Sequence, residues 1–151
     1  MLTYKIFILI VMIFLHIIED FHLQGILANM KQKIWWEKEL IKSHMYYSEK
    51  TWKKYKYDYV ISLIVHSLEN AIFVTLPIII NDLYYTFTVN KDNKLWIAWL
   101  LDIWLIGYTH YDIDDLKCNR MKINLIIDQL LHFVMIAFIW LCHWNDLGMW
   151  M

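Results

Sequence analysis

The sequence predicts an all-α integral membrane protein, a bundle of four transmembrane helices in a single domain that covers residues 1–151. Three observations support this fold class. The chain is 60% hydrophobic, with nine Trp and ten Tyr but only three Gly and one Pro, which is too apolar for a soluble domain of this size. Its apolar residues form four blocks that can cross a hydrocarbon layer of ~30 Å as helices. The segments between the blocks differ sharply in Lys and Arg content, as the connections of a membrane protein do.

The four predicted spans cover about residues 2–23, 59–80, 95–114 and 123–144. The first resembles a signal peptide, but no small-x-small cleavage site follows it, so we interpret it as an uncleaved anchor. The third is the shortest and carries Asp102 within its apolar stretch.

The distribution of Lys and Arg predicts the orientation of the bundle. Residues 28–58 hold eight of these cations and residues 115–122 hold three, against three in the rest of the chain. Basic connections stay on the cytoplasmic side of a membrane. We therefore expect both termini outside the cytoplasm, in a protein of the inner (cytoplasmic) membrane.

The long first connection has the composition of an interfacial amphipathic helix. Ile34, Trp35 and Leu40 are interspersed with Lys31 and Lys38, as in a helix that lies on a membrane surface. We favour a solvated, anchoring face for these lysines, and binding of anionic lipids is the alternative. Membrane lipids are the first expected partners.

Ionisable side chains recur inside the predicted spans at a four-residue spacing, which stacks them on one helix face ~6 Å apart. Three pairs follow it: His16 and Asp20, His110 and Asp114, and Asp128 and His132. Gln24 continues the face of the first pair, and His66 and Asn70 lie early in the second span. Such groups are costly at the end of a membrane helix unless they pair, bind an ion or face water.

The depth of these residues in the membrane is the stronger argument. Under the predicted orientation, His16 and His110 lie late in helices that run toward the cytoplasm, whereas His66 and His132 lie early in helices that run away from it. All of them therefore fall in one layer in the cytoplasmic half of the membrane. A site in the core of a bundle requires such a common level.

Four His and three Asp at one level indicate a metal centre, and the candidate ligands are His16, Asp20, His66, His110, Asp114, Asp128 and His132. A catalytic zinc takes three protein ligands and a water. The set therefore fits either two ions bridged by an Asp, or one ion with the surplus Asp orienting the imidazoles. A divalent metal, zinc first, is the expected cofactor.

The remaining polar residues of the layer have expected supporting roles. Asp20, Asp114 and Asp128 would serve as ligands, as a bridge or as the general base. Lys117 would position substrate beside them, and hydrogen bonds from Gln24, Asn70 and Gln129 would hold the ligands or the substrate.

A metal ion with an open position can activate water or polarise a carbonyl or phosphoryl oxygen. We therefore predict a metal-dependent hydrolase that acts on a lipid or another amphiphilic substrate from the cytoplasmic leaflet. Lys117 and Arg120 are placed to hold a phosphate. Taken by themselves, these two cations are better explained as cytoplasmic anchors.

Two other functions stay open. In a non-enzymatic protein, such as a phage factor that alters the host envelope, the polar layer would only hold helices together. In an ion or proton conductor, the His and Asp would form a relay. Seven polar groups at one level favour a metal site over a purely structural layer. A relay is disfavoured because only Asp102 continues the row of polar groups toward the outside.

Several features are less informative. A net charge close to zero argues against nucleic-acid binding, and a homo-oligomer stays open. Cys118 and Cys142 have no metal-type spacing. His22, His44 and His143 are expected at exposed edges.

The motifs resemble an uncharacterised integral membrane family of bacteria and phages, a domain of unknown function. They are His16-x3-Asp20-Phe-x-Leu-Gln24, a His in the second span, His110-x3-Asp114-x2-Lys117 and Asp128-Gln129-x2-His132. The resemblance covers all four spans and implies the same polar positions, beside which this sequence adds Glu69, Asp112 and Asp115. The family is loosely similar to membrane-bound metal-dependent hydrolases, which implies hydrolysis by analogy alone.

Overall fold

The computed structural model describes residues 2–42, 53–89 and 95–147, and every regular element in these ranges is a helix. The elements are α1 (Leu2–Ile18), the π-helical turn η1 (Glu19–Leu23), α2 (Leu27–Met30), α3 (Lys33–Lys42), α5 (Asp58–Val89), α6 (Leu95–Cys118) and α7 (Leu125–Cys142). The predicted all-α fold is therefore confirmed for the part of the chain that is described.

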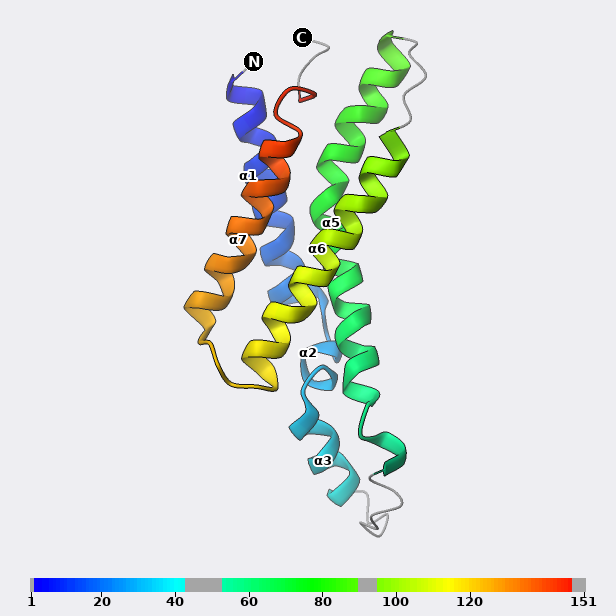
Figure 1. The fold of residues 1–151 in the computed structure, drawn as a ribbon, viewed down its shortest axis with the longest axis vertical. Coiled ribbons are helices and arrows are strands. Elements are labelled where there is room, and N and C mark those ends of the chain that lie inside the picture. The colour runs from blue at the N-terminus through cyan, green and yellow to red at the C-terminus, as the bar shows by residue number, and fades with distance from the viewer. Residues whose placement is uncertain (1, 43–52, 90–94, 148–151) are drawn as a thin grey trace.

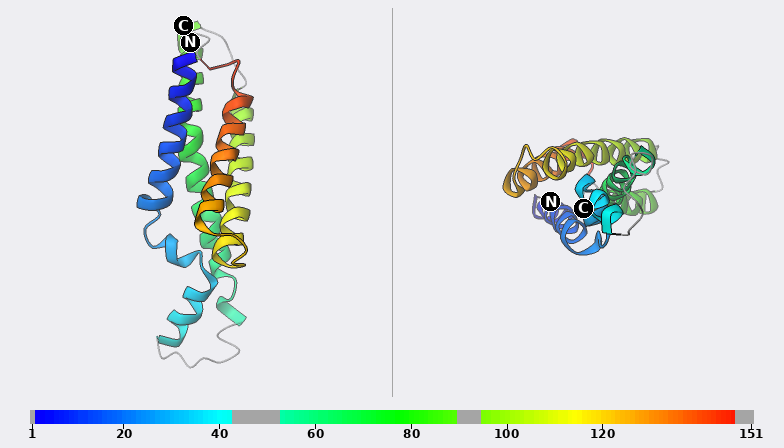
Figure 2. Two further views of the ribbon diagram at one scale, coloured as in Figure 1. Left: turned by 90° about the vertical axis from the view of Figure 1, so that its left-hand side faces the viewer. Right: turned by 90° about the horizontal axis from the view of Figure 1, so that it is seen from below.

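The four long helices lie side by side with alternating direction (Figure 1). Each of α1, α5, α6 and α7 contacts two of the others, in the order α1, α5, α6, α7 and back to α1, so they surround a common core. The start of α1 and the end of α7 lie at one end of the bundle, and α2 and α3 lie at the other end, beside the start of α5 (Figures 1 and 2).

Three helical segments are long and apolar enough to cross a membrane: Leu2–Leu23, Lys53–Thr88 and Leu125–Cys142. They overlap the first, second and fourth predicted spans. The 24 residues of α6 make it ~36 Å long, which is sufficient to cross. However, Asp102, His110 and Asp112 lower its hydropathy. The chain thus has the helices of a membrane protein, and a fourth span stays a prediction.

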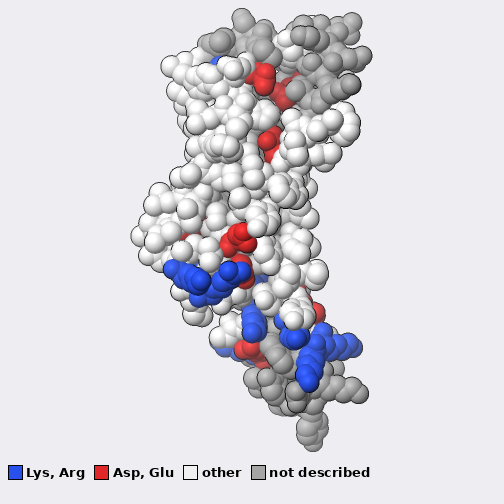
Figure 3. All heavy atoms as spheres, viewed as in Figure 1, with Lys and Arg blue, Asp and Glu red and all other residues white. Residues whose placement is uncertain are grey.

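Charged side chains divide the surface along the long axis of the bundle. In the view of Figure 3, Lys and Arg gather at the end that carries α2, α3 and the turn between α6 and α7, whereas a middle band around the long helices is almost free of charge. The basic end corresponds to the two connections that the Lys and Arg count places in the cytoplasm.

The described part of the first connection contains the helices α2 and α3, but its lysines do not all form a solvated face. Lys31, at the end of α2, is only 4% exposed and enters the bundle. The interpretation of Lys31 as part of an anchoring surface is therefore wrong, because acidic residues inside the bundle attract its ammonium. The placement of α3 on a membrane surface stays a prediction, and His44 lies outside the described residues.

An apolar layer separates two polar levels of the bundle, and its buried side chains are Met12, Ala71, Val74, Ile78, Ile106, Ile136 and Ile139. On α7, for example, His132 lies on one side of this layer and His143, just after the helix, lies on the other. We call the level nearer α2 the His/Asp cluster. The level nearer the termini, which we call the terminal group, contains Asn81, Asp82, Trp99, Asp102 and His143.

Gly107 lies between these two levels and allows α5 and α6 to approach closely. A Cβ atom at Gly107 would lie 3.6 Å from side-chain atoms of Ala71 and Leu68 and 3.6 Å from the carbonyl oxygen of Ser67. Small residues at such contacts are typical of helices packed in a membrane, where close backbone approach replaces hydrophobic burial as the source of packing energy.

Candidate metal centre

The first helix directs two adjacent carboxylates into the bundle at the point where its winding changes. The π turn at Glu19–Leu23 is closed by a hydrogen bond from the Gln24 N–H to the Glu19 carbonyl at 3.1 Å. Such a turn holds one residue more than an α-helical turn and is common at functional sites. Glu19 and Asp20 are both buried here, whereas the four-residue spacing pointed to Asp20 alone.

His66 of α5 lies at the centre of the His/Asp cluster, with three carboxylates around one imidazole. Its Nδ1 is 3.2 Å from Glu19 Oε1, and its Nε2 is 3.3 Å from Asp20 Oδ1 and 3.2 Å from Asp114 Oδ2. His110 Nε2 lies 3.0 Å from the same His66 Nε2. These side chains come from three elements, η1, α5 and α6, and all are buried.

Lys31 places an ammonium in the midst of these groups. Its Nζ donates to Asp114 Oδ2 at 2.6 Å, lies 3.0 Å from His66 Nε2 and is 3.7 Å from Asp20 Oδ1. Burial opposes the charge of Lys31, but Asp114 and Asp20 outweigh this effect and raise the pKa of Lys31 above its ordinary value. Lys31 is therefore a buried cation at neutral pH.

His16 is held between two amide side chains. Its Nδ1 lies 3.0 Å from Asn70 Nδ2 and its Nε2 lies 3.3 Å from Gln129 Oε1. The same amides also donate to carboxylates, Asn70 to Glu19 Oε2 at 2.7 Å and Gln129 to Asp20 Oδ2 at 2.8 Å. With these amide orientations, His16 Nδ1 accepts and His16 Nε2 carries the proton. Both ring nitrogens are thus engaged, and a role of His16 as a metal ligand stays a prediction.

His132 of α7 faces oxygen atoms that have no hydrogen-bond donor. Its Nε2 lies 3.8 Å from Asp114 Oδ1 and 3.7 Å from Asp128 Oδ1. All three atoms are buried and have no hydrogen-bond partner among the described residues. The other oxygen of each carboxylate is paired, Asp114 Oδ2 with Lys31 and Asp128 Oδ2 with Lys117 at 2.6 Å. Unpaired acceptors from two helices therefore face one ring nitrogen of α7.

A small cavity of about 10 Å³ lies beside the His132 side chain, and it is lined by His16, Asn70, Ile106, Thr109, His110, His132, Met135 and Ile136. Two of the lining rings, those of His110 and His132, stack on each other with centroids 4.2 Å apart. A volume of this size is close to the minimum for one water molecule.

The geometry fits a divalent ion. Ligand atoms around a tetrahedral ion with bonds of ~2.1 Å lie ~3.4 Å apart, and the two distances from His132 Nε2 exceed this by a few tenths of an ångström. Two groups could hold an ion, namely His110, Asp114 and His132, and Glu19, Asp20, His66 and His110, with ligand atoms of each group within 4.8 Å of one another. The prediction that these helices bring together residues able to hold a metal ion is therefore confirmed. The identity of the metal stays a prediction.

The cations predicted to hold a phosphate are both paired with acids. Lys117 donates to Asp128 Oδ2, and the Lys117 side chain is 25% exposed. Arg120 donates from Nε to Asp115 Oδ2 at 2.6 Å, and its side chain is 55% exposed. Lys117 therefore belongs to the edge of the cluster, whereas Arg120 faces outward.

The structure brings together almost all of the predicted site residues: His16, Asp20, His66, Asn70, His110, Asp114, Lys117, Asp128, Gln129 and His132. The catalytic and metal-binding roles given to them stay predictions. Gln24 is half-buried, and its Oε1 has no hydrogen-bond partner in the described part of the chain. Glu19 and Lys31 are members of the cluster that the sequence reasoning missed.

His143 is not at an exposed edge, as predicted, but is only 7% exposed. Its Nε2 is 2.7 Å from Asp102 Oδ2, so the ring belongs to the terminal group and pairs with its acid on α6. The prediction was wrong because His143 lies eleven residues after His132, which is close to three helical turns and returns to the same inward face. His22 is exposed, as expected.

Comparison of the chain with protein-family models, with curated proteins and with solved structures finds no match. The resemblance to a membrane family of unknown function therefore rests on the motifs alone.

Proposed function

We propose that the protein is an intramembrane metal-dependent hydrolase that acts on a lipid or another amphiphilic substrate from the cytoplasmic leaflet. One observation carries this proposal: His110, Asp114 and His132 offer ligand atoms within 4.8 Å of one another. The unpaired Oδ1 atoms of Asp114 and Asp128 also lie 3.8 and 3.7 Å from His132 Nε2, which is unpaired as well. Buried acceptors without donors are rare in proteins and need a physical explanation.

The charge of the cluster supports a bound cation. Four carboxylates, those of Glu19, Asp20, Asp114 and Asp128, face two ammonium groups, those of Lys31 and Lys117. The carboxylates outnumber the ammonium groups by two, so the remaining positive charge has to come from protonated imidazoles or from a bound cation. Uncompensated charge is expensive inside a membrane, so a divalent ion would stabilise the bundle as well as supply chemistry.

When bound, a divalent ion with an open position would polarise a substrate oxygen or activate water at neutral pH. The chain's own residues would prepare the site for this chemistry. Asp128 lies at its edge, with Oδ1 toward His132 and Oδ2 held by Lys117, so Lys117 would orient this carboxylate toward the ion. Asn70 and Gln129 fix the orientation of His16 and of the acids through their hydrogen bonds.

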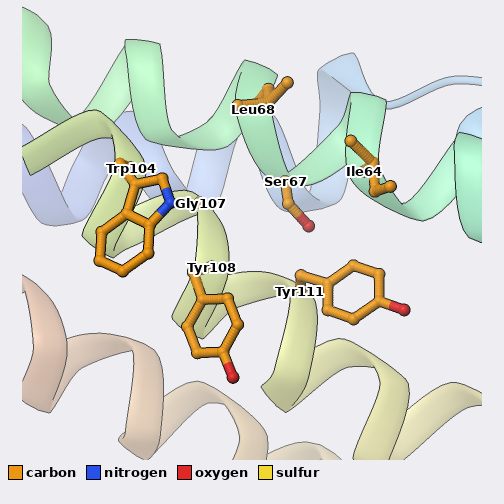
Figure 4. Close-up of a pocket in the computed structure, with 7 residues that line it drawn as sticks. All are labelled: Ile64, Ser67, Leu68, Trp104, Gly107, Tyr108 and Tyr111. Atoms are coloured by element: carbon orange, nitrogen blue, oxygen red, sulfur yellow. The ribbon is translucent and has the colours of Figure 1, made fainter. Parts of the chain in front are cut away.

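A groove on the outside of the bundle supports an amphiphilic substrate. It has a volume of about 290 Å³ and lies between α5 and α6, lined by Ile64, Ser67, Leu68, Trp104, Gly107, Tyr108 and Tyr111 (Figure 4). Ser67 and Tyr111 directly follow His66 and His110, so the wall of the groove is one residue away from the cluster. Its lining is almost wholly apolar, which suits the hydrocarbon chain of a lipid.

The test is hydrolysis by the purified full chain in liposomes of phosphatidylethanolamine and phosphatidylglycerol, with Zn²⁺ supplied and products identified by mass spectrometry. His132→Ala removes a ligand from the site, and His143→Ala is the matched control because this ring lies in the terminal group. We expect lipid products from the wild type and His143→Ala and none from His132→Ala. Equal product from all three, or no product from the wild type, would contradict the proposal.

A non-enzymatic role of the cluster is the second candidate, because Lys31 and Lys117 already pair with Asp114 and Asp128 and thereby join helices. Metal analysis separates the two functions. A structural cluster predicts a chain without stoichiometric metal in which His132→Ala changes only stability. An ion conductor is less well supported, since the buried layer around Met12, Ile106 and Ile136 contains no ionisable residue among those described.

A further inference from the structure

Lys31 is fixed in the cluster through its backbone as well as its ammonium. Asn119, which directly follows α6, donates to the Lys31 carbonyl oxygen at 3.2 Å and accepts from the Lys33 N–H at 2.8 Å. Asn119 is itself bonded to Asp115 Oδ1 at 3.0 Å. The residues between α2 and α3 are therefore attached to the end of α6, and the Lys31 side chain reaches inward from a fixed point.

The cluster has two sides that differ in their contact distances. On one side the Lys31 ammonium makes contacts of 2.6 Å to Asp114 Oδ2 and 3.0 Å to His66 Nε2, which are hydrogen-bond lengths. On the other side, the 3.7 and 3.8 Å that separate His132 Nε2 from Asp128 Oδ1 and Asp114 Oδ1 are too long for hydrogen bonds. Unpaired buried atoms occur on both sides, at Glu19 Oε1, Asp20 Oδ1 and His66 Nδ1 on the first and around His132 Nε2 on the second. The difference is that the first side contains the Lys31 ammonium, whereas no ammonium contacts His132 Nε2 among the described residues.

Asp114 belongs to both sides. Its Oδ2 faces the ammonium of Lys31 and its Oδ1 faces His132. In two-metal hydrolytic sites the ions lie ~3.5–4 Å apart and act on one substrate from two directions. A carboxylate that contacts both positions, as Asp114 does here, is the usual bridge in such a site.

We propose that Lys31 is the resident second cation of this site: its ammonium fills one of two cation positions in the cluster, so the chain binds one divalent ion, on the His132 side, instead of two. The proposal rests on the proposed function only for the presence of a metal on the His132 side. A substrate oxygen that reaches the cluster would then lie between a metal ion and an ammonium. This pair favours substrates with an anionic oxygen, such as a phosphate ester.

The experiment counts ions in the detergent-purified full chain by calorimetric titration with Zn²⁺. We expect one Zn²⁺ per chain for the wild type and two for Lys31→Ala, because the vacated position keeps Asp20, His66 and Asp114 around it. Lys38→Ala is the matched control, since Lys38 is exposed on the neighbouring helix α3, and it should bind one ion.

The outcomes separate the two proposals. A wild type that binds two ions, or a Lys31→Ala chain that still binds one, overturns the role of Lys31 and leaves the metal site in place. A wild type that binds no Zn²⁺ overturns the metal-dependent function together with it.

A second measurement needs no variant. An amine-acylating reagent, read by peptide mass spectrometry, should label Lys38 and leave Lys31 unlabelled, both with and without saturating Zn²⁺. If the ion and the ammonium instead competed for one position, Zn²⁺ would expel the side chain. Labelling of Lys31 that rises severalfold on addition of Zn²⁺ therefore contradicts the proposal.

Discussion

The His/Asp cluster and the terminal group contain similar residues in different arrangements. In the terminal group, each acid is satisfied by its immediate neighbours. Asp102 lies 2.7 Å from His143 Nε2, and Asp82 accepts from Trp99 Nε1 at 2.9 Å and from Asn81 Nδ2 at 3.1 Å. These contacts fasten the ends of the helices and leave no shared centre.

In the His/Asp cluster, by contrast, the contacts are incomplete in a consistent way. Asp114 and Asp128 each have one oxygen paired with a lysine and one that is unpaired, and both unpaired oxygens face His132. Among the described residues, potential metal-holding groups occur here and none occurs in the terminal group. Buried His and Asp alone therefore do not define a site, whereas unpaired atoms of α6 and α7 that face one another indicate one.

The largest expected effect comes from breaking the cluster at its bridging acid. Asp114→Ala leaves the Lys31 ammonium buried without its closest partner, and breaking a buried ion pair in this way costs about 3–5 kcal/mol of unfolding free energy. Unfolding in detergent, followed by helical circular dichroism, measures the loss. A variant as stable as the wild type would show that the pair does not form.

The second expected effect is stabilisation by metal, which should distinguish the two regions directly. Zn²⁺ at a hundred times its dissociation constant should stabilise the wild type by about 2.7 kcal/mol, because the ion binds only the folded chain. His143→Ala should gain as much and His132→Ala almost nothing. The same unfolding assay with and without Zn²⁺ tests this, and an equal gain in both variants would place the ion elsewhere.

A smaller effect is expected from the terminal group. His143→Ala removes the contact to Asp102 and should lower the unfolding free energy by about 1 kcal/mol, as for a typical buried hydrogen bond. Zn²⁺ content, measured by elemental analysis, should not change. If this variant loses its metal, the two polar levels are coupled through the apolar layer. The terminal group would then contribute to metal binding, contrary to the distinction drawn above.

The smallest effect is expected between the two regions, at Gly107. The added Cβ of Gly107→Ala would be in ordinary van der Waals contact with Ala71, Leu68 and Ser67. Alanine is also the better helix former by up to ~1 kcal/mol. Stability should therefore stay constant or rise slightly, with metal binding unchanged. A marked fall in the midpoint temperature of thermal denaturation would show that α5 and α6 cannot move apart at this contact without loss of stability.

The four-residue spacing predicted which helix faces would meet, and it worked because α-helices stack residues such as His110 and Asp114 on one side. The common depth of His16, His66 and His132 also followed from the sequence, because alternating helices return to the same level at matching positions. The all-α class followed from composition. A count of four spans depends on α6, whose polar residues weaken its apolar signal.

The sequence contains no pattern that predicts the presence of Lys31 and Glu19 in the His/Asp cluster. Lys31 is one of eight cations in its connection, and its backbone position depends on Asn119, nearly ninety residues away in the chain. Glu19 was missed because a regular helix would place only Asp20 on the same face as His16. The local sequence contains no pattern that predicts a π turn. By contrast, the spacing from His132 to His143 was readable and was overlooked.

The π turn at Glu19–Leu23 restricts the positions at which this chain could lose a residue. Deleting any one residue there would let the segment rewind as an ordinary helix, with space for one inward acid instead of two. Tolerance of single-residue deletions should therefore be lower in these five positions than in the turn that joins α6 to α7, although neither stretch looks unusual in composition.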